Sequence, residues 1–384
     1  MTTVDARITE AVQTSHPQLL ALSRDLYEHP ETAWEEVRSS RRVAEELSDN
    51  GFDVTTGYCG LDTAFAAHLG SGELHIALCA EYDALPGLGH ACGHNLISAI
   101  SVGAAVALAS VADDLGLTVT VIGTPAEEGG GGKIELLERG GFDGQHAAAM
   151  VHPGPVDVVR ARPYAVSHSH IEYRGKSAHA AAYPERGINA ADAFTIAQVA
   201  IGLLRQQLPS TVRVHGMVTR GGEAPNAIAE HTEGRWYVRA ETLDELARLE
   251  PRVMRCFEAG ALASGAELVV TPESKPYAEF RTDEELLACY ERRATAAGRR
   301  FAEGPDTMMA RASTDMGNVS QVLPAIHPYI GIDSLPAVNH QPEFAAATMT
   351  PAAETAIAHG ASALAGTVVD AASQPALRNR LLGR

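Results

Sequence analysis

Short apolar runs alternate with helical segments between residues 75 and 151, and only a few folds accommodate this order. Three runs have the length and composition of buried strands: HIALCA, LTVTVIG and HAAAMV. Two segments between them are predicted as helices, LISAISVGAAVALASVA and KIELLERG. Strands that alternate with helices are typical of a parallel sheet covered by helices. The sequence therefore predicts an α/β fold with a mostly parallel sheet for this part of the chain.

A different pattern begins at about Ser167. Four segments are predicted as strands, with helices at 188–208 and 242–264 between them. The strand segments are HSHIEYRG, TVRVHGMVTRG, GRWYVRAE and AELVVTP. This β-α-β-β-α-β order is that of a ferredoxin-like α+β unit. After about Pro276 the chain returns to helices and the strand PAIHPYIGI. We therefore expect a catalytic domain made of residues 1–166 and 277–384, with the domain 167–276 inserted into it.

Size and charge narrow the class of protein further. A chain of 384 residues is too long for one core of about 100–200 residues. Its net charge of -18 and its lack of basic clusters argue against nucleic acid as a partner. The five cysteines are widely scattered, the amino terminus lacks a signal-peptide pattern, and the longest apolar stretch, 96–112, is short for a membrane span. We expect a cytoplasmic protein without a membrane partner.

Residues that commonly bind metals lie just beyond several of the predicted strands. Because the carboxyl ends of parallel strands meet at one edge of a sheet, we expect these side chains to converge there. Thiolate, imidazole and carboxylate together suit zinc or a similar divalent ion. The candidates are Cys92, His94, Glu127, Glu128, His152 and His340.

The adjacent pair Glu127 and Glu128 suggests a division of labour. Neighbouring residues in a loop point in different directions, so one carboxylate can bind a metal while the other takes a proton from an activated water. The pair alone would also fit a solvated helix cap. The glycine run that follows, EEGGGGK, lacks the first glycine and the final Ser or Thr of a phosphate-binding loop.

These motifs, in this order, resemble the zinc aminoacylase and carboxypeptidase family of metallopeptidases, in particular its amidohydrolase branch with auxin-conjugate, hippurate and aminobenzoyl-glutamate hydrolases. The resemblance covers nearly the whole chain and rests on DLYEHPETAWEE, AEYDALPG, GHACGHN, TPAEEGGGGK, MVHPGP, YRGKSAHAAAYPERGINA, GGEAPNAIAEHTEGRWYVRAE, STDMGNVS and NHQPEF. It implies two divalent metal ions, zinc or manganese, bridged by Cys92, with Glu127 as general base and Asp83 supporting the site. The other implied ligands are His94, Glu128, His152 and His340.

The resemblance also assigns roles to the inserted domain, which in the family acts as a lid and as a dimerisation domain. It implies that His179 stabilises the oxyanion, often from the partner subunit of a homodimer, and that Asn226 and Arg239 bind the free carboxylate of the substrate. Without the motif match, these residues would fit a surface turn, a loop cap and a strand face. Four further histidines, His168, His170, His215 and His327, receive no catalytic role.

We therefore expect a metal-dependent amidohydrolase or metallopeptidase of aminoacylase or dipeptidase type. Its expected substrate is a small carboxylate-bearing amide, either an N-acyl or N-aroyl amino acid such as aminobenzoyl-glutamate or a dipeptide, cleaved by water in a crevice between the domains. Asn95 stands where many relatives carry Asp, which favours the subgroup with aminobenzoyl-glutamate hydrolases and a β-alanyl dipeptidase. The alternatives are a metal-dependent binder of a carboxylated ligand, which would have no use for Glu127 as a base, and a nucleotide-binding protein.

Overall fold

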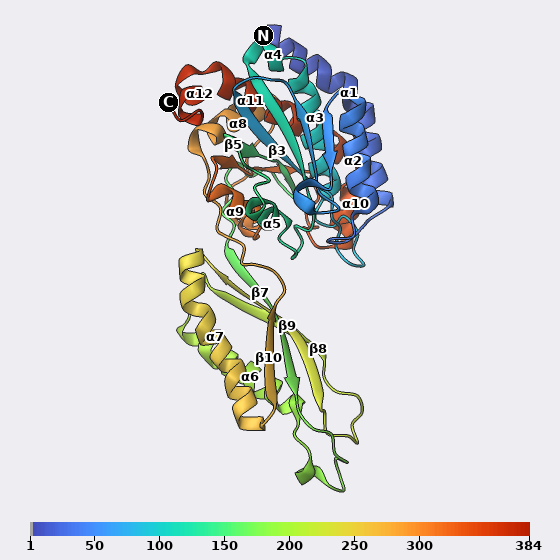
Figure 1. Cartoon of the computed structure of the whole chain (residues 1–384), viewed down its shortest axis with the longest axis vertical. Coiled ribbons are helices and arrows are strands. Elements are labelled where there is room, and N and C mark those ends of the chain that lie inside the picture. The colour runs from blue at the N-terminus through green and yellow to red at the C-terminus, as the bar shows by residue number, and fades with distance from the viewer. Residues whose placement is uncertain (1–2) are drawn as a thin grey trace. The chain divides into compact units, whose positions relative to one another are not determined.

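The computed structural model describes residues 3–384, which form two compact units. The first unit comprises the residues up to Arg162 together with Phe280–Arg384, and the second comprises Pro163–Glu279. The first unit is a mixed sheet with helices packed around it, and the second has a sheet and two long helices of its own (Figure 1). No helix among the described residues is long and apolar enough to span a membrane.

The central sheet of the first unit is mostly parallel, as the sequence predicts. Its six strands are ordered β1-β2-β4-β3-β5-β11. The pairs β3·β4, β3·β5 and β5·β11 are parallel, whereas β1 and β2 add two antiparallel pairings at one edge. A short parallel pair, β6·β12, continues from the strands β5 and β11. The strands are β1 (Asp53–Thr56), β2 (Phe65–Leu69), β3 (Leu74–Glu81), β4 (Leu117–Thr124), β5 (Ala147–Ala149), β6 (His152–Gly154), β11 (Ala325–Ile326) and β12 (Tyr329–Gly331).

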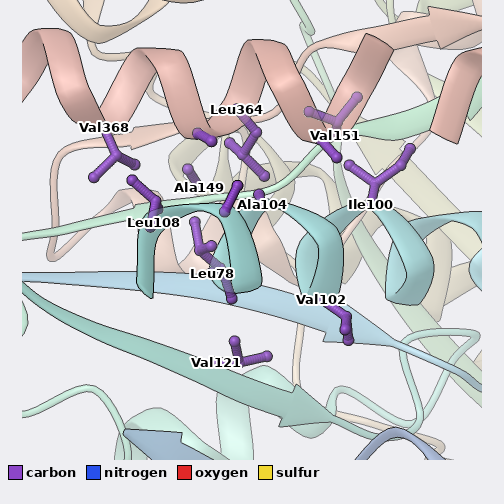
Figure 2. Packing of buried hydrophobic residues seen from close by; sticks show 14 of the residues in the cluster. Leu78, Ile100, Val102, Ala104, Leu108, Val121, Ala149, Val151, Leu364 and Val368 are labelled. Atoms are coloured by element: carbon purple, nitrogen blue, oxygen red, sulfur yellow. The ribbon is translucent and has the colours of Figure 1, made fainter. Parts of the chain in front are cut away.

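Helix α3 (His94–Ala109) forms the centre of the hydrophobic core. Nearly all of its residues are buried, as expected of a helix that is apolar on every side. It lies between strands β3 and β4 and helix α11, with Leu108 near Leu364 and Val368 (Figure 2). The other helices of this unit are α1 (Thr3–Glu28), α2 (Val37–Asp49), α4 (Ala112–Leu115), α5 (Gly132–Glu138), α8 (Glu284–Ala296), α9 (Met316–Ser320), α10 (Pro342–Ala347), α11 (Pro351–Ser373) and α12 (Pro375–Leu381).

The second unit has the predicted β-α-β-β-α-β order. Its antiparallel sheet is ordered β10-β7-β9-β8, so that the first and third strands are the central ones. The two helices pack on one another, and Trp236 of β9 contacts Phe194 and Phe257 of these helices in a core of its own. Its elements are β7 (Ala165–Arg174), α6 (Ala190–Leu204), β8 (Arg213–Arg220), β9 (His231–Ala240), α7 (Leu243–Ser264) and β10 (Glu267–Pro272).

Candidate metal centre

The turn that carries Cys92 and His94 lies between β3 and α3. His94 is the first residue of α3, two residues earlier than the sequence suggests. Gly93 between them has φ +84°, and a Cβ atom there would lie 2.4 Å from Cγ of Pro153. Only glycine satisfies both conditions without strain. The local sequence thus packs the turn directly against the strand that contains His152.

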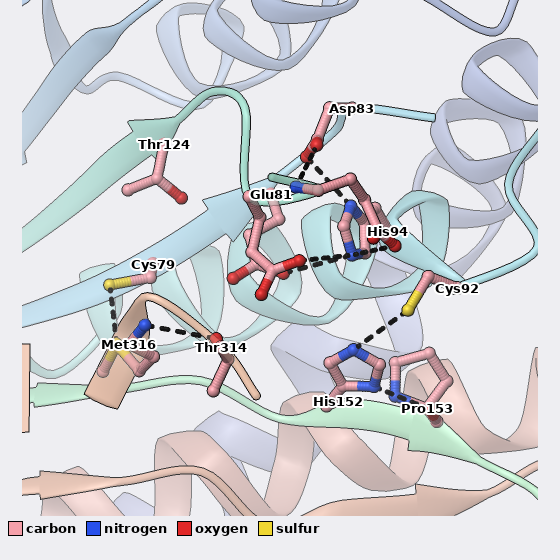
Figure 3. A network of polar contacts seen from close by, with 12 residues as sticks. Cys79, Glu81, Asp83, Cys92, His94, Thr124, His152, Pro153, Thr314 and Met316 are labelled. Atoms are coloured by element: carbon pink, nitrogen blue, oxygen red, sulfur yellow. Dashed lines mark hydrogen bonds and ion pairs between the residues drawn. The ribbon is translucent and has the colours of Figure 1, made fainter. Parts of the chain in front are cut away.

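The candidate ligands form overlapping groups at the ends of several strands. One ligand atom each from Cys92, His94 and His152 lies within 4.8 Å of the others, and the same holds for Cys92 with Glu128 and His340. The Cys92 Sγ atom lies 3.7 Å from Nε2 of His152, and Nε2 of His340 lies 3.3 Å from Oε1 of Glu128. Figure 3 shows Cys92 between His94 and His152. A third group joins His94 to Glu127 and Glu128, so Cys92, His94 and Glu128 each belong to two of the three groups.

Hydrogen bonds orient the imidazole rings of two candidate ligands. Nδ1 of His94 donates to Asp83 at 3.0 Å, and Nδ1 of His152 donates to the carbonyl of Pro153 at 2.7 Å (Figure 3). The second oxygen of Asp83 accepts the backbone N–H of Glu128 at 2.8 Å. Each ring therefore keeps Nε2 for the centre, which is how histidine ligands are usually fixed. The same Asp83 ties a histidine and the glutamate loop together.

Glu127 is a buried carboxyl in an acidic environment. Its Oε2 lies 3.9 Å from Nε2 of His94, and Oε1 of Glu128 lies 4.0 Å from the same atom. Burial, and then the charges of Glu81 and Glu128, raise the pKa of Glu127 well above its usual value. Such a carboxyl can accept and return a proton during a reaction.

A buried ionic cluster that the sequence did not indicate lies beside this group. Nζ of Lys133 is 2.6 Å from Glu81 and 2.7 Å from Asp315, and all three side chains have no exposed surface. The other oxygen of Glu81 lies 3.5 Å from Nε2 of His94 (Figure 3). Glu81 ends β3 two residues before Asp83, and that proximity was the only signal in the sequence.

His327 also has no role in the sequence-based expectations. Its ring centroid lies 5.4 Å from that of His152, and only 1% of the residue is exposed. Neither ring nitrogen has a hydrogen-bond partner within the described residues. Burial lowers the pKa of His327 to about 4, which keeps the ring neutral. Its place just after β11, one strand from His152, is the signal that could have found it.

The three remaining predicted residues belong to the second unit. Nδ1 of His179 accepts the N–H groups of Ala181 and Ala182 at 3.3 and 3.2 Å, so in the neutral ring Nε2 carries the proton. The segment of His179 pairs with that of Asn226 through the bridge to the adjacent Ala227. Arg239 lies on β9, where its Nε donates to Nε2 of His215 at 3.1 Å.

Comparison with known proteins identifies the family. Residues 77–368 match the sequence model of Peptidase family M20/M25/M40. The Xaa-Arg dipeptidase of Mus musculus is 38% identical over 388 residues, covering 97% of this chain and 89% of that protein. One of the subunits of the p-aminobenzoyl-glutamate hydrolase of Escherichia coli (strain K12) is 32% identical over 276 residues, covering 66% of this chain and 57% of that one.

A solved structure agrees with the fold. The YXEP protein of Bacillus subtilis, described as a dinuclear metal binding peptidase from the M20 family, superposes with a TM-score of 0.67 at 22% identity, covering 93% of this chain and 99% of that one. From the extent of these matches, the chain belongs to Peptidase family M20/M25/M40.

Proposed function

We propose that this protein hydrolyses the amide bond of a dipeptide or N-acyl amino acid at a centre of two divalent cations. Membership of the peptidase family and the dipeptidase and amidohydrolase relatives make it a metal-dependent hydrolase of small amides. The observation that carries the two-cation proposal is that the donors form three overlapping groups, two of which share the Cys92 thiol.

The donor set fits such cations chemically. One group joins Cys92 to two imidazoles, a second joins it to a carboxylate and an imidazole, and a third joins His94 to two carboxylates. These are ligands that zinc and manganese accept. Nε2 of His94 is buried and makes no hydrogen bond among residues 3–384, which is costly for a polar atom unless a cation satisfies it. We propose zinc or manganese.

The catalytic roles of the side chains follow from their chemistry. Two bound cations polarise a carbonyl and make water more acidic. In the proposed reaction Glu127 takes the proton from the attacking water and returns it to the leaving amine. His179 donates from Nε2–H to the oxygen of the carbonyl under attack, and Asn226 and Arg239 bind the free carboxylate of the substrate.

The relatives favour one class of substrate. The Xaa-Arg dipeptidase match extends over nearly the whole chain, whereas the aminobenzoyl-glutamate hydrolase match covers two thirds of it. We therefore propose a dipeptide with a basic carboxyl-terminal residue as the first substrate to test, and aminobenzoyl-glutamate as the second. We also propose a cytoplasmic homodimer, whose state sedimentation analysis would determine.

The test combines metal analysis with a substrate panel. The purified protein should hold two equivalents of zinc or manganese, measured by mass spectrometry, and should release amino acid from Xaa-Arg or Xaa-Lys dipeptides. Glu127→Gln should lower kcat by at least about 10²-fold, since general-base catalysis contributes that much, while metal content stays at two. In contrast, Glu128→Gln should lose metal and activity together. Normal turnover by Glu127→Gln would contradict the proposal, as would a wild-type protein that binds substrate without cleaving it.

A further inference from the structure

Ala126, immediately before the two glutamates, has a strained backbone. Its φ is +55°, a left-handed conformation that is unfavourable for a residue other than glycine. The residue is fully buried and follows Pro125 at the end of β4. A conformation of this kind persists only where surrounding contacts hold it. It also sets the direction in which the chain enters Glu127 and Glu128.

The contact that holds Ala126 comes from a residue 90 positions earlier. Oε1 of Glu36 accepts the backbone N–H of Ala126 at 2.8 Å, and the Glu36 side chain is fully buried. On its other side, the carbonyl of Ala126 accepts the N–H of Gly130 at 3.1 Å. Both backbone polar groups of the strained residue are therefore fixed, one of them by a side chain from outside the loop.

The position of Glu36 suggests a simpler role that the structure does not support. Glu36 immediately precedes α2, where an acidic side chain commonly caps a helix. However, its side chain makes no capping hydrogen bond to α2. A buried carboxyl group is costly, and one oxygen of this one accepts its hydrogen bond from a loop distant in sequence, beside a further contact with Thr63. Its contact with Ala126 is thus a specific feature of the fold.

The segment before Glu36 packs on the same loop. A Cβ atom at Gly130 would lie 2.7 Å from Nε1 of Trp34 and 2.6 Å from Cβ of Ala126. Trp34 itself has a positive φ of 68°. The segment from Trp34 to Glu36 and the loop from Ala126 to Gly130 therefore fit together closely, and a shift of one would move the other.

We propose that Glu36 is a positioning residue for hydrolysis: by accepting the Ala126 N–H, it holds the left-handed backbone that presents Glu127 as general base and Glu128 as ligand. This inference rests on the proposed function. Glu36 does not touch the substrate in this account. Its effect on turnover passes entirely through the backbone of Ala126, and this route makes a distinctive prediction about glycine at that position.

The test is a mutant cycle on the metal-loaded protein. Glu36→Met keeps the side-chain volume but removes the acceptor, and it should lower kcat at least tenfold with little change in KM or metal content. The conservative Glu36→Gln keeps an acceptor oxygen and should retain most of the turnover. Adding Ala126→Gly to Glu36→Met should restore kcat several-fold relative to Glu36→Met alone, because glycine adopts positive φ without strain.

Two controls separate positioning from general damage. Glu46→Met removes a buried glutamate within α2, which pairs with Arg42 at 2.8 Å, and should leave kcat unchanged. Hydrogen exchange at the Ala126 amide should accelerate in Glu36→Met and not in Glu46→Met. This readout does not depend on activity, so it still tests the inference if the wild-type protein cleaves no amide and the proposed function fails.

Several outcomes would overturn the inference. A wild-type kcat in Glu36→Met, beside an inactive Glu127→Gln, would refute the positioning role and leave the proposed function standing. A double variant as slow as Glu36→Met would show that Glu36 acts by another route. If Glu36→Met fails to fold, the double variant should fold and turn over, because glycine removes the strain; failure of both to fold would make the contact purely structural.

Discussion

Removing the charge of Lys133 should destabilise the first unit strongly. Its Nζ lies within 2.7 Å of both Glu81 and Asp315, and no atom of the three side chains is exposed. Lys133→Met keeps most of the side-chain length but leaves two buried carboxylates without their cation. Breaking a buried ion pair in this way usually costs about 3–5 kcal/mol, and we expect a loss in that range at pH 8.

The loss should depend on pH in a defined direction. Burial raises the pKa of Asp315 to about 6 even with Lys133 beside it. Without the ammonium group, the folded pKa of Asp315 lies further above its unfolded value. The folded variant then keeps a proton that the unfolded chain has released, so its stability falls as the pH rises from the unfolded pKa to the folded pKa. Lys133→Met should therefore lose more stability at pH 8 than at pH 5.

Denaturant titration of the chelated protein, followed by circular dichroism, measures both effects. The two units need not unfold in one step, so the transition of the first unit has to be resolved separately. Lys133→Met/Asp315→Asn should recover part of the loss, because one unpaired anion is removed, and the exposed Lys176→Met serves as control. A loss below about 1 kcal/mol at pH 8, or an equal loss at both pH values, would refute the reasoning.

Three further predictions concern the candidate centre. Burial and the charge of Asp83 raise the pKa of Glu36 from 4.5 to about 7. Denaturation in chelator should therefore show the stability of the wild type falling relative to Glu36→Gln by about 3 kcal/mol between pH 4.5 and 8. A stability difference that does not change with pH would contradict this. Cys92→Ala should lose both metal ions and His340→Ala only one by mass spectrometry, because the thiolate is shared; two ions retained in Cys92→Ala would exclude a bridge. If His179 acts across a homodimer, mixing His179→Ala with Glu127→Gln should restore turnover that neither variant has, whereas a mixture that stays inactive would place the residue in the same chain.

The fold was predictable because its signals are local. The all-round apolar helix α3 and the short strands around it follow from hydrophobic pattern alone, and the structure confirms the mostly parallel sheet and the separate antiparallel one. The ligand candidates could be named because parallel strands end at one edge. Their gathering around Cys92 is a property of the structure, while their role as ligands stays a prediction until metal is measured.

The buried charges were not predictable, because their burial depends on distant contacts. Lys133 lies in the first turn of a short helix that follows a glycine run, a position where lysine is usually solvated. Only the packing of α5 on α9 brings it to Asp315. Glu36 resembles a helix cap by position, and its bond to Ala126 spans 90 residues. His327 follows a strand of only two residues. No pattern in the neighbouring sequence indicates any of these contacts.

These buried charges link folding to cation binding. The candidate centre and the ionic cluster beside it contain five buried or nearly buried carboxyl groups, and Lys133 is the one lysine in the described chain that balances them from within the core. An excess of buried negative charge disfavours the cation-free fold and favours any state in which divalent ions occupy the donors. Ligand binding at 100 times Kd stabilises a fold by about 2.7 kcal/mol, a substantial share of a typical net stability. If the centre holds divalent cations as proposed, we expect these carboxyl groups to make the stability of the first unit depend on them. The carboxyl groups are Glu81, Asp83, Glu127, Glu128 and Asp315.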